Sequence, residues 1–187
     1  MKHLFLFFFL SILFACNTYT PKPRGYFRID LPEKKYVLYN PTSCPFSFEY
    51  PVYAKVVKDS DSRAEPCWIN VEFPELNGKI HISYKTIQHN FAKFSEEARI
   101  LAYKHSIKAD AITETLIKKP GKVSGIKYTI EGDAASSVQF FVSDSTKHFL
   151  RGALYFTVIT RKDSLAPVIQ FVEKDIDHLI HTLKWKD

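Results

Sequence analysis

Apolar and polar residues alternate along several stretches in the middle of this chain. In residues 44–50 the aromatic side chains fall on one side of an extended segment, which is typical of a β-strand with one buried face. Residues 67–73 and 80–84 repeat the pattern, and Asn77-Gly78 between them is a dipeptide that tight turns favour. These three stretches predict a strand followed by a β-hairpin.

The period of two returns in the second half of the chain. Four further segments alternate, each separated from the next by a short turn sequence: 111–117, 122–131, 135–143 and 148–160. Consecutive strands joined by short turns form an antiparallel meander. Several of these segments are apolar on both faces, so we expect the sheet to be covered on both sides.

Two stretches have helical spacing instead. Asn90 is a suitable N-cap for a helix over residues 90–108, and Ser164 is a suitable N-cap for one over residues 164–183. Core-facing positions recur at steps of three and four in each helix: Phe94, Ala98, Leu101 and His105 in the first, and Val168, Val172, Ile176, Leu179 and Leu183 in the second. The order of elements predicts an α+β fold in which helices flank an antiparallel β-sheet.

The N-terminus has the composition of an export signal. A basic start precedes an apolar run over residues 4–14, which would rise only about 16 Å as a helix and is too short to span a bilayer. Ala15-Cys16 resembles a lipobox, in which the cysteine is acylated and becomes the new N-terminus. We predict a lipoprotein signal peptide over residues 1–15 with lipid attachment at Cys16; an ordinary secretory signal is the alternative.

The rest of the chain divides into a tether and one domain. Residues 16–23 are polar and contain two prolines, which indicates a flexible tether from the lipidated Cys16. Residues 24–187 have the size of a single globular domain, and 45% of the chain is hydrophobic, which is enough material for a core.

Charge and cysteine content narrow the possible partners. The formal net charge is +6, but the basic residues are dispersed, whereas nucleic-acid binding wants a concentrated basic face. We therefore expect no nucleic-acid partner and only weak attraction to anionic lipid head groups. Cys44 and Cys67 form an even pair in an exported chain, which predicts a disulfide; two reduced core cysteines are the alternative.

Candidate chemistry is sparse. Asp144 and His148 flank a predicted turn, where Asp usually serves backbone hydrogen bonds, and we expect this turn to contact a partner. Asp175, His178 and His181 lie on neighbouring turns of the last predicted helix, so they could converge on a divalent metal or form its solvated polar face. No phosphate-binding loop, zinc-protease motif or Cys-x-x-Cys pair occurs. We predict a binding module that is not an enzyme and needs no cofactor.

The segment 24–32 is richer than a tether requires. Its alternation predicts a strand or an extended arm that packs through one face, which includes Ile29. It is interpreted either as an edge segment that covers the core or as a binding epitope. In the second interpretation Arg24, Tyr26 and Arg28 face a partner, because Arg and Tyr are favoured interface anchors.

Together these features resemble the gliding-motility-associated lipoproteins of the Bacteroidetes, the GldD family. The stretches that carry the resemblance follow Cys16 along nearly the whole mature chain: 21–29, 44–46, 67–69, 103–105, 132–141 and 144–156. The resemblance implies a cell-envelope lipoprotein required for gliding motility, tied to the type IX secretion system, with the inner-membrane protein GldE as the expected partner. It carries no catalytic residue over to this chain.

Lipoproteins of these bacteria that reach the cell surface often have acidic residues directly after the cysteine. None follows Cys16, which favours a periplasm-facing lipid anchor at the inner or the outer membrane. The order of elements is also similar to the PsbP-like α/β/α sandwich, although a fold does not dictate function. We expect a non-enzymatic binding or stabilising component of the gliding and secretion apparatus. The alternative is a metal- or small-molecule-binding, enzyme-like periplasmic domain.

Overall fold

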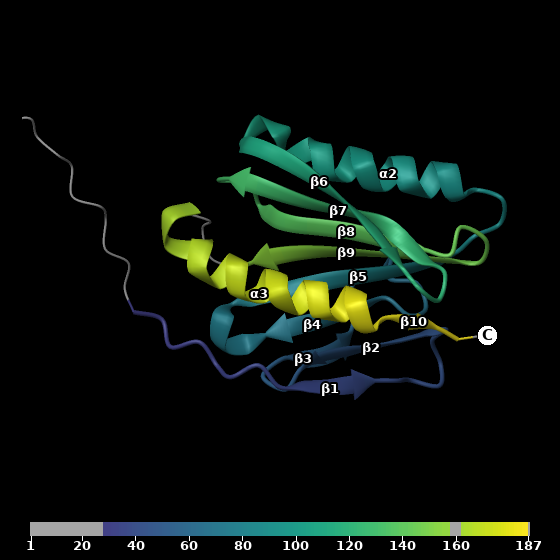
Figure 1. The fold of residues 1–187 in the computed structure, drawn as a ribbon, viewed down its shortest axis with the longest axis horizontal. Coiled ribbons are helices and arrows are strands. Elements are labelled where there is room, and N and C mark those ends of the chain that lie inside the picture. The colour runs from purple at the N-terminus through teal and green to yellow at the C-terminus, as the bar shows by residue number, and fades with distance from the viewer. Residues whose placement is uncertain (1–27, 158–161, 187) are drawn as a thin grey trace, which may run out of the picture.

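A computed structural model describes residues 28–157 and 162–186, which form two antiparallel sheets and two α-helices (Figure 1). The larger sheet has seven strands in the spatial order β3-β4-β5-β9-β8-β7-β6. Their bounds in chain order are β3 Lys55–Lys58, β4 Ile69–Phe73, β5 Gly78–Thr86, β6 Ala109–Lys119, β7 Val123–Gly132, β8 Ser136–Ser143 and β9 His148–Phe156. Every neighbouring pair is antiparallel, so the predicted α+β class with its meander is confirmed.

The smaller sheet has the order β1-β2-β10 and is packed against helix α3. Its strands are β1 Tyr36–Tyr39, β2 Phe46–Pro51 and β10 Lys184–Trp185. The two helices are α2, Phe91–Tyr103, and α3, Lys162–Thr182, and two short 3-10 helices span Pro74–Leu76 and Lys104–Ile107. Neither α2 nor α3 is long and apolar enough to span a bilayer.

Two hydrophobic cores lie on opposite faces of the large sheet. The first core contains the predicted apolar stripe, which is buried at all five positions: Val168, Val172, Ile176 and Leu179 on α3, and Leu183 directly after its end. The second core lies under α2 and includes Ala98 and Ala102 of that helix. Phe140 and Phe141 are consecutive on β8 but belong to different cores, as side chains that alternate across a strand must. Both faces of the sheet are therefore covered, as the sequence predicted.

The predicted hairpin is confirmed as β4 and β5. Gly78 pairs with Phe73, and the 3-10 helix Pro74–Leu76 forms the connection. Asn77 adopts a φ of +51°, a left-handed conformation that asparagine tolerates better than most residues do.

The helix boundaries differ from those predicted. Helix α2 ends at Tyr103 and continues only as a 3-10 turn. Asn90 precedes α2, but its side chain accepts a hydrogen bond from the backbone N–H of Gln88 at 2.8 Å and does not cap the helix. Helix α3 begins at Lys162, so Ser164 lies inside it and the predicted cap is wrong.

Three short strands and the start of the domain were not predicted correctly. Strands β1, β3 and β10 have four residues or fewer, so each offers too few alternations to be recognised. Residues 28–35 contain no strand, and the first strand begins at Tyr36. Ile29, which was expected to pack against the core, is 39% exposed.

Candidate functional site

Asp175 is the centre of a buried polar network that joins the start of the domain to helix α3. Its side chain is carried by α3 on the side of the buried stripe, and the residue is only 2% exposed. Oδ1 accepts hydrogen bonds from Lys34 Nζ at 2.7 Å and from the Tyr36 hydroxyl at 3.0 Å. Oδ2 accepts one from the Tyr53 hydroxyl at 2.7 Å. Three donors from the N-terminal part of the domain thus satisfy one buried carboxylate.

The ammonium group of Lys34 contacts polar groups and an aromatic ring. Its Nζ also donates to the carbonyl of Phe171 at 3.0 Å and lies 3.6 Å from the centroid of the Phe171 ring. A cation over an aromatic face gains a further attraction when both are partly desolvated. The described residues that precede β1, 28–35, continue the predicted arm. Through Lys34 this arm is fastened to α3 by an ion pair, a hydrogen bond to a backbone carbonyl and a contact with an aromatic ring.

The two tyrosines of the network have perturbed acidities. The pKa of Tyr36 is raised to about 12, mainly by burial and secondly by the hydrogen bond to Asp175. Burial and the same carboxylate also raise the pKa of Tyr53. Both hydroxyls donate to a negative group, so the neutral phenol is the favoured form.

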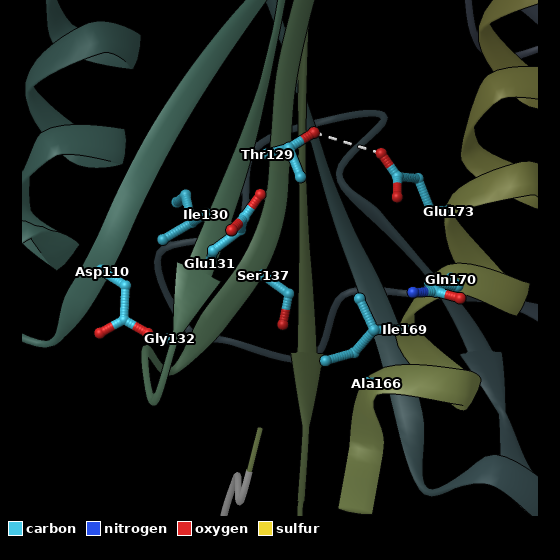
Figure 2. Close-up of a pocket in the computed structure, with 10 residues that line it drawn as sticks. All are labelled: Asp110, Thr129, Ile130, Glu131, Gly132, Ser137, Ala166, Ile169, Gln170 and Glu173. Atoms are coloured by element: carbon cyan, nitrogen blue, oxygen red, sulfur yellow. Dashed lines mark hydrogen bonds between the residues drawn. The ribbon is translucent and has the colours of Figure 1, made fainter. Parts of the chain in front are cut away.

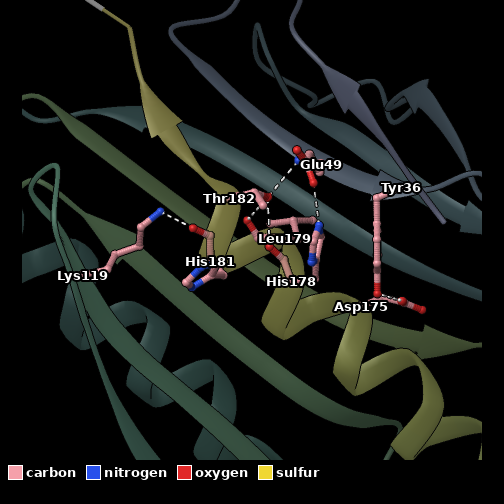
Figure 3. A network of polar contacts seen from close by, with 8 residues as sticks. All are labelled: Tyr36, Glu49, Lys119, Asp175, His178, Leu179, His181 and Thr182. Carbon is pink, nitrogen blue, oxygen red and sulfur yellow. Dashed lines mark hydrogen bonds and ion pairs between the residues drawn. The ribbon is translucent and has the colours of Figure 1, made fainter. Parts of the chain in front are cut away.

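His178 and His181 do not join Asp175 around a common point, as Figure 3 shows. His178 Nε2 lies 2.7 Å from Glu49 Oε2, and its ring stacks on Tyr36 with centroids 3.6 Å apart. The side chain of His181 is exposed. In the part of the chain that the structure describes, no group of three or more His, Cys, Asp or Glu could hold a metal ion. The interpretation of these three residues as metal ligands is therefore wrong. Their interpretation as a solvated polar face is wrong for Asp175, which is buried, whereas His181 is exposed.

Lys119 was not singled out in the sequence, yet it closes the C-terminal end of α3. Its Nζ donates to the carbonyls of His181 at 2.6 Å and Leu183 at 2.7 Å (Figure 3 shows the first). The pKa of Lys119 is lowered, mainly by burial and secondly by the positive charge of the nearby Lys184. A lysine that donates to the last carbonyls of a helix also meets the negative end of its dipole. This contact joins the edge strand β6 to α3.

In the turn between β8 and β9, the side chains of Asp144 and His148 both form hydrogen bonds within the domain. Asp144 Oδ1 accepts backbone N–H groups from Thr146 at 3.0 Å, Lys147 at 2.8 Å and His148 at 2.8 Å. His148 Nδ1 lies 2.8 Å from the Tyr84 hydroxyl. Asp144 and His148 therefore shape the turn, and the residues between them are its exposed part.

This turn predicts a pH effect on stability. Burial raises the pKa of Asp144, but the three backbone donors outweigh it and lower the pKa to about 2. A depressed carboxyl pKa stabilises the fold above the unfolded value near 4, and that contribution is lost as the pH falls toward 2. We expect Asp144→Asn to cost about 1 kcal/mol at pH 6, with solvent screening of this partly exposed group taken into account. Urea unfolding of both proteins should show the difference shrinking between pH 4 and 2; a constant difference would contradict it.

A cleft of about 480 Å³ lies between the first half of α3 and the ends of β6, β7 and β8 (Figure 2). Its lining mixes apolar side chains with three carboxylates, those of Asp110, Glu131 and Glu173. Glu173 accepts hydrogen bonds from Thr129 Oγ1 at 3.2 Å and from Lys127 Nζ at 3.1 Å, so it is already paired. The acidic lining suits a basic side chain of a protein partner better than an anionic substrate.

The remaining predicted residues fall near or before the start of the described chain. Cys16, Arg24 and Tyr26 lie outside the described residues. Arg28 is described, and its Nε donates to Asp30 Oδ1 at 2.8 Å on an exposed segment.

The structure joins Cys44 and Cys67 in a disulfide with the Cα atoms 5.6 Å apart. Cys44 lies two residues before β2 of the smaller sheet, and Cys67 lies two residues before β4 of the larger sheet. The disulfide therefore links the two sheets.

Residues 16–185 match the protein family described as gliding motility lipoprotein GldD. Among solved structures, the chain is similar to the solution structure of cyanobacterial PsbP (CyanoP) from Synechocystis sp. PCC 6803, with a TM-score of 0.52 and 9% sequence identity. The alignment covers 83% of this chain and 95% of that chain, and at this identity the likeness shows the fold alone. No curated protein matches the chain.

The predicted PsbP-like fold is confirmed by this structural likeness, and the predicted family is confirmed by a match that begins at Cys16 and covers most of the sequence. The chain belongs to the family of gliding motility lipoproteins GldD.

Proposed function

We propose that this gliding motility lipoprotein is a non-enzymatic binding and stabilising component of the gliding and type IX secretion apparatus. In this proposal Cys16 carries the lipid, the domain faces the periplasm, and the inner-membrane protein GldE is the partner. Family membership supports the role in gliding and the envelope location. The structural observation that carries the proposal is the fastening of the arm to α3 through Lys34 and Asp175.

This fastening matters because the arm connects the domain to its proposed anchor. A chain of the length between Cys16 and Lys34 reaches about 25 Å if it behaves as a flexible linker. The network of Lys34, Tyr36 and Asp175 determines the side of the domain from which that linker leaves. A domain held close to the membrane through one fixed side suits a protein that binds a membrane partner.

The uses of the other polar residues support a binding role over catalysis. Asp175 and His178 bind groups of the smaller sheet and its arm. Asp144 and His148 bind groups of their own turn and of β5. Each of these side chains stabilises the fold, which is the task expected of polar groups in a scaffold.

The proposed contact with the partner is the arm residues Arg24, Tyr26 and Arg28. The Arg28 side chain is 88% exposed, and its only short contact among the described residues is the local one with Asp30. An exposed arginine beside the membrane anchor can reach an acidic surface on a membrane protein. The turn at Asp144 and His148 is the second proposed contact, presented through its exposed residues.

Replacing Arg24, Tyr26 and Arg28 together with alanine should abolish gliding while the protein stays at its normal level. The change removes the proposed contact, and Arg28, the one of the three residues that the structure describes, has an exposed side chain. Colony spreading and single-cell gliding measure the effect, and cross-linking followed by capture of GldE measures the contact directly. Normal motility of the triple variant would sink the contact proposal.

Two control strains sharpen this experiment. Arg63 is an exposed arginine paired with Asp61, two residues away, just as Arg28 is paired with Asp30, so Arg63→Ala should glide normally. Cys16→Ala shows the behaviour of a domain that is made but not held at the membrane, and we expect it in the soluble envelope fraction with impaired gliding. Full motility of the Cys16→Ala strain would contradict the anchor as part of the function.

A further inference from the structure

Strand β6 forms one edge of the seven-stranded sheet and pairs only with β7 among the described strands. It is eleven residues long, from Ala109 to Lys119. A long edge strand presents a row of unpaired backbone N–H and C=O groups, and natural proteins protect such edges with short length, charges or a cover. Here the edge also carries Leu116, which is 83% exposed. A large aliphatic side chain on an open edge is a typical feature of strands that pair with another chain.

The side chains beside Leu116 have opposite charges. Glu114, Leu116 and Lys118 are alternate residues, so they share one face of β6, and all three are exposed. This face is the one that carries α2, because the Tyr103 hydroxyl of α2 donates to Glu114 Oε1 at 2.9 Å. Along the strand the order is therefore acid, aliphatic, base.

That order is complementary to itself. In a pair of antiparallel strands related by a two-fold axis, each residue faces a residue whose number is reflected through the axis. With the axis at Leu116, the two leucines oppose each other, and each Glu114 opposes Lys118 of the second copy. Shifting the register by two residues sets Glu114 against Leu116, and shifting it by four sets Glu114 against Glu114. Only the first of these registers joins both charge pairs and buries both leucines.

We propose that β6 binds a second copy of this chain, with the two β6 strands antiparallel and Leu116 on the two-fold axis. The two large sheets then become one continuous sheet, and the edge groups of residues 113–119 gain backbone partners. The charge order around Leu116 identifies the occupant as another copy. The proposal goes beyond the role in gliding and does not depend on GldE being the partner. Such a dimer presents two anchors and two arms to the membrane, which raises the effective affinity for any partner with two sites.

Cysteine cross-linking in intact cells tests both the surface and the register. In the full chain, Leu116→Cys should form a disulfide-linked dimer on mild oxidation, because opposed residues of paired strands lie within the Cα distance that a disulfide needs. Thr113→Cys should cross-link poorly, since residue 113 opposes residue 119 in this register. Val57→Cys on β3, at the other edge of the same sheet, is the control for random collision. The unsubstituted chain, in which Cys44 and Cys67 are bonded to each other, is the blank.

Charge reversal provides the second test, carried out with Leu116→Cys present. Glu114→Lys or Lys118→Glu alone places like charges together at two symmetric positions, and we expect the dimer yield to fall about tenfold. The two reversals together restore opposite charges and should restore the yield, which also rules out misfolding as the cause of the loss. Cross-linking no faster than for Val57→Cys, a product containing a different protein, or single reversals without effect would each overturn the proposal.

Discussion

Asp175→Ala should lower the free energy of unfolding by about 3 kcal/mol, because removing one partner of a buried ion pair leaves the other uncompensated. The carboxylate accepts hydrogen bonds from Lys34, Tyr36 and Tyr53 at a residue that is 2% exposed, so the variant leaves these three donors without their acceptor. Urea unfolding of the wild-type and variant domains at pH 7 measures the difference. The variant should also lower the pKa of Tyr36 from about 12 toward its ordinary value near 10, which ultraviolet titration of tyrosine follows.

The control for this prediction lies on the same helix. Asp177 pairs with Lys127, but its side chain is 53% exposed, and Lys127 keeps Glu173 as a second partner. Asp177→Ala should therefore cost less than about 1 kcal/mol. A combined Lys34→Met and Asp175→Leu variant removes both charges and should recover much of the lost stability. Equal losses for Asp175→Ala and Asp177→Ala would contradict the buried network as a source of stability.

Loss of the Cys44–Cys67 disulfide should cost about 3 kcal/mol, which corresponds to a fall in Tm of about 10 °C for a domain of this size. The bond joins residues 23 apart in sequence, and it restricts the unfolded chain by closing that loop. Thermal unfolding of the purified protein with and without a thiol reductant measures the effect.

The double variant Cys44→Ala and Cys67→Ala is the control for the reductant itself. It should have the lower Tm in both conditions and show no response to the thiol. Cys67 has a φ of +66°, so alanine keeps the unfavourable left-handed backbone there, and Cys67→Gly should recover about 1 kcal/mol. An unchanged Tm of the wild-type protein after complete reduction would show that the bond adds no stability.

The elements of the fold were predictable where a periodic pattern met a buried surface. Residues 67–73 and 80–84 alternate because one face of β4 and of β5 meets the core under α3. The stripe from Val168 to Leu183 was predictable for the same reason, because each member packs into one core. Strand β1 was missed because Tyr36, Val37, Leu38 and Tyr39 are all large and show no alternation.

One signal for Asp175 was present in the sequence and was not used. Asp175 follows Val172 by three residues and precedes Leu179 by four, which is the spacing of the buried stripe itself. A carboxylate at that spacing must be buried and needs donors from another element. The sequence did not reveal those donors, because Lys34 lies 141 residues away and precedes a strand that periodicity missed.

By itself, the sequence determined the fold class, most strands, both helices and the family, because these follow from local patterns and from motifs read along the chain. It also predicts the lipid attachment at Cys16, which lies outside the described residues. Only the tertiary structure decided which polar residues meet. Asp175 binds the arm, His178 binds Glu49, and His181 turns outward, because the packing of β1 and β2 against α3 sets the depth and direction of each side chain. Spacing along one helix constrains which side a residue faces, whereas its partners depend on the elements brought against that side.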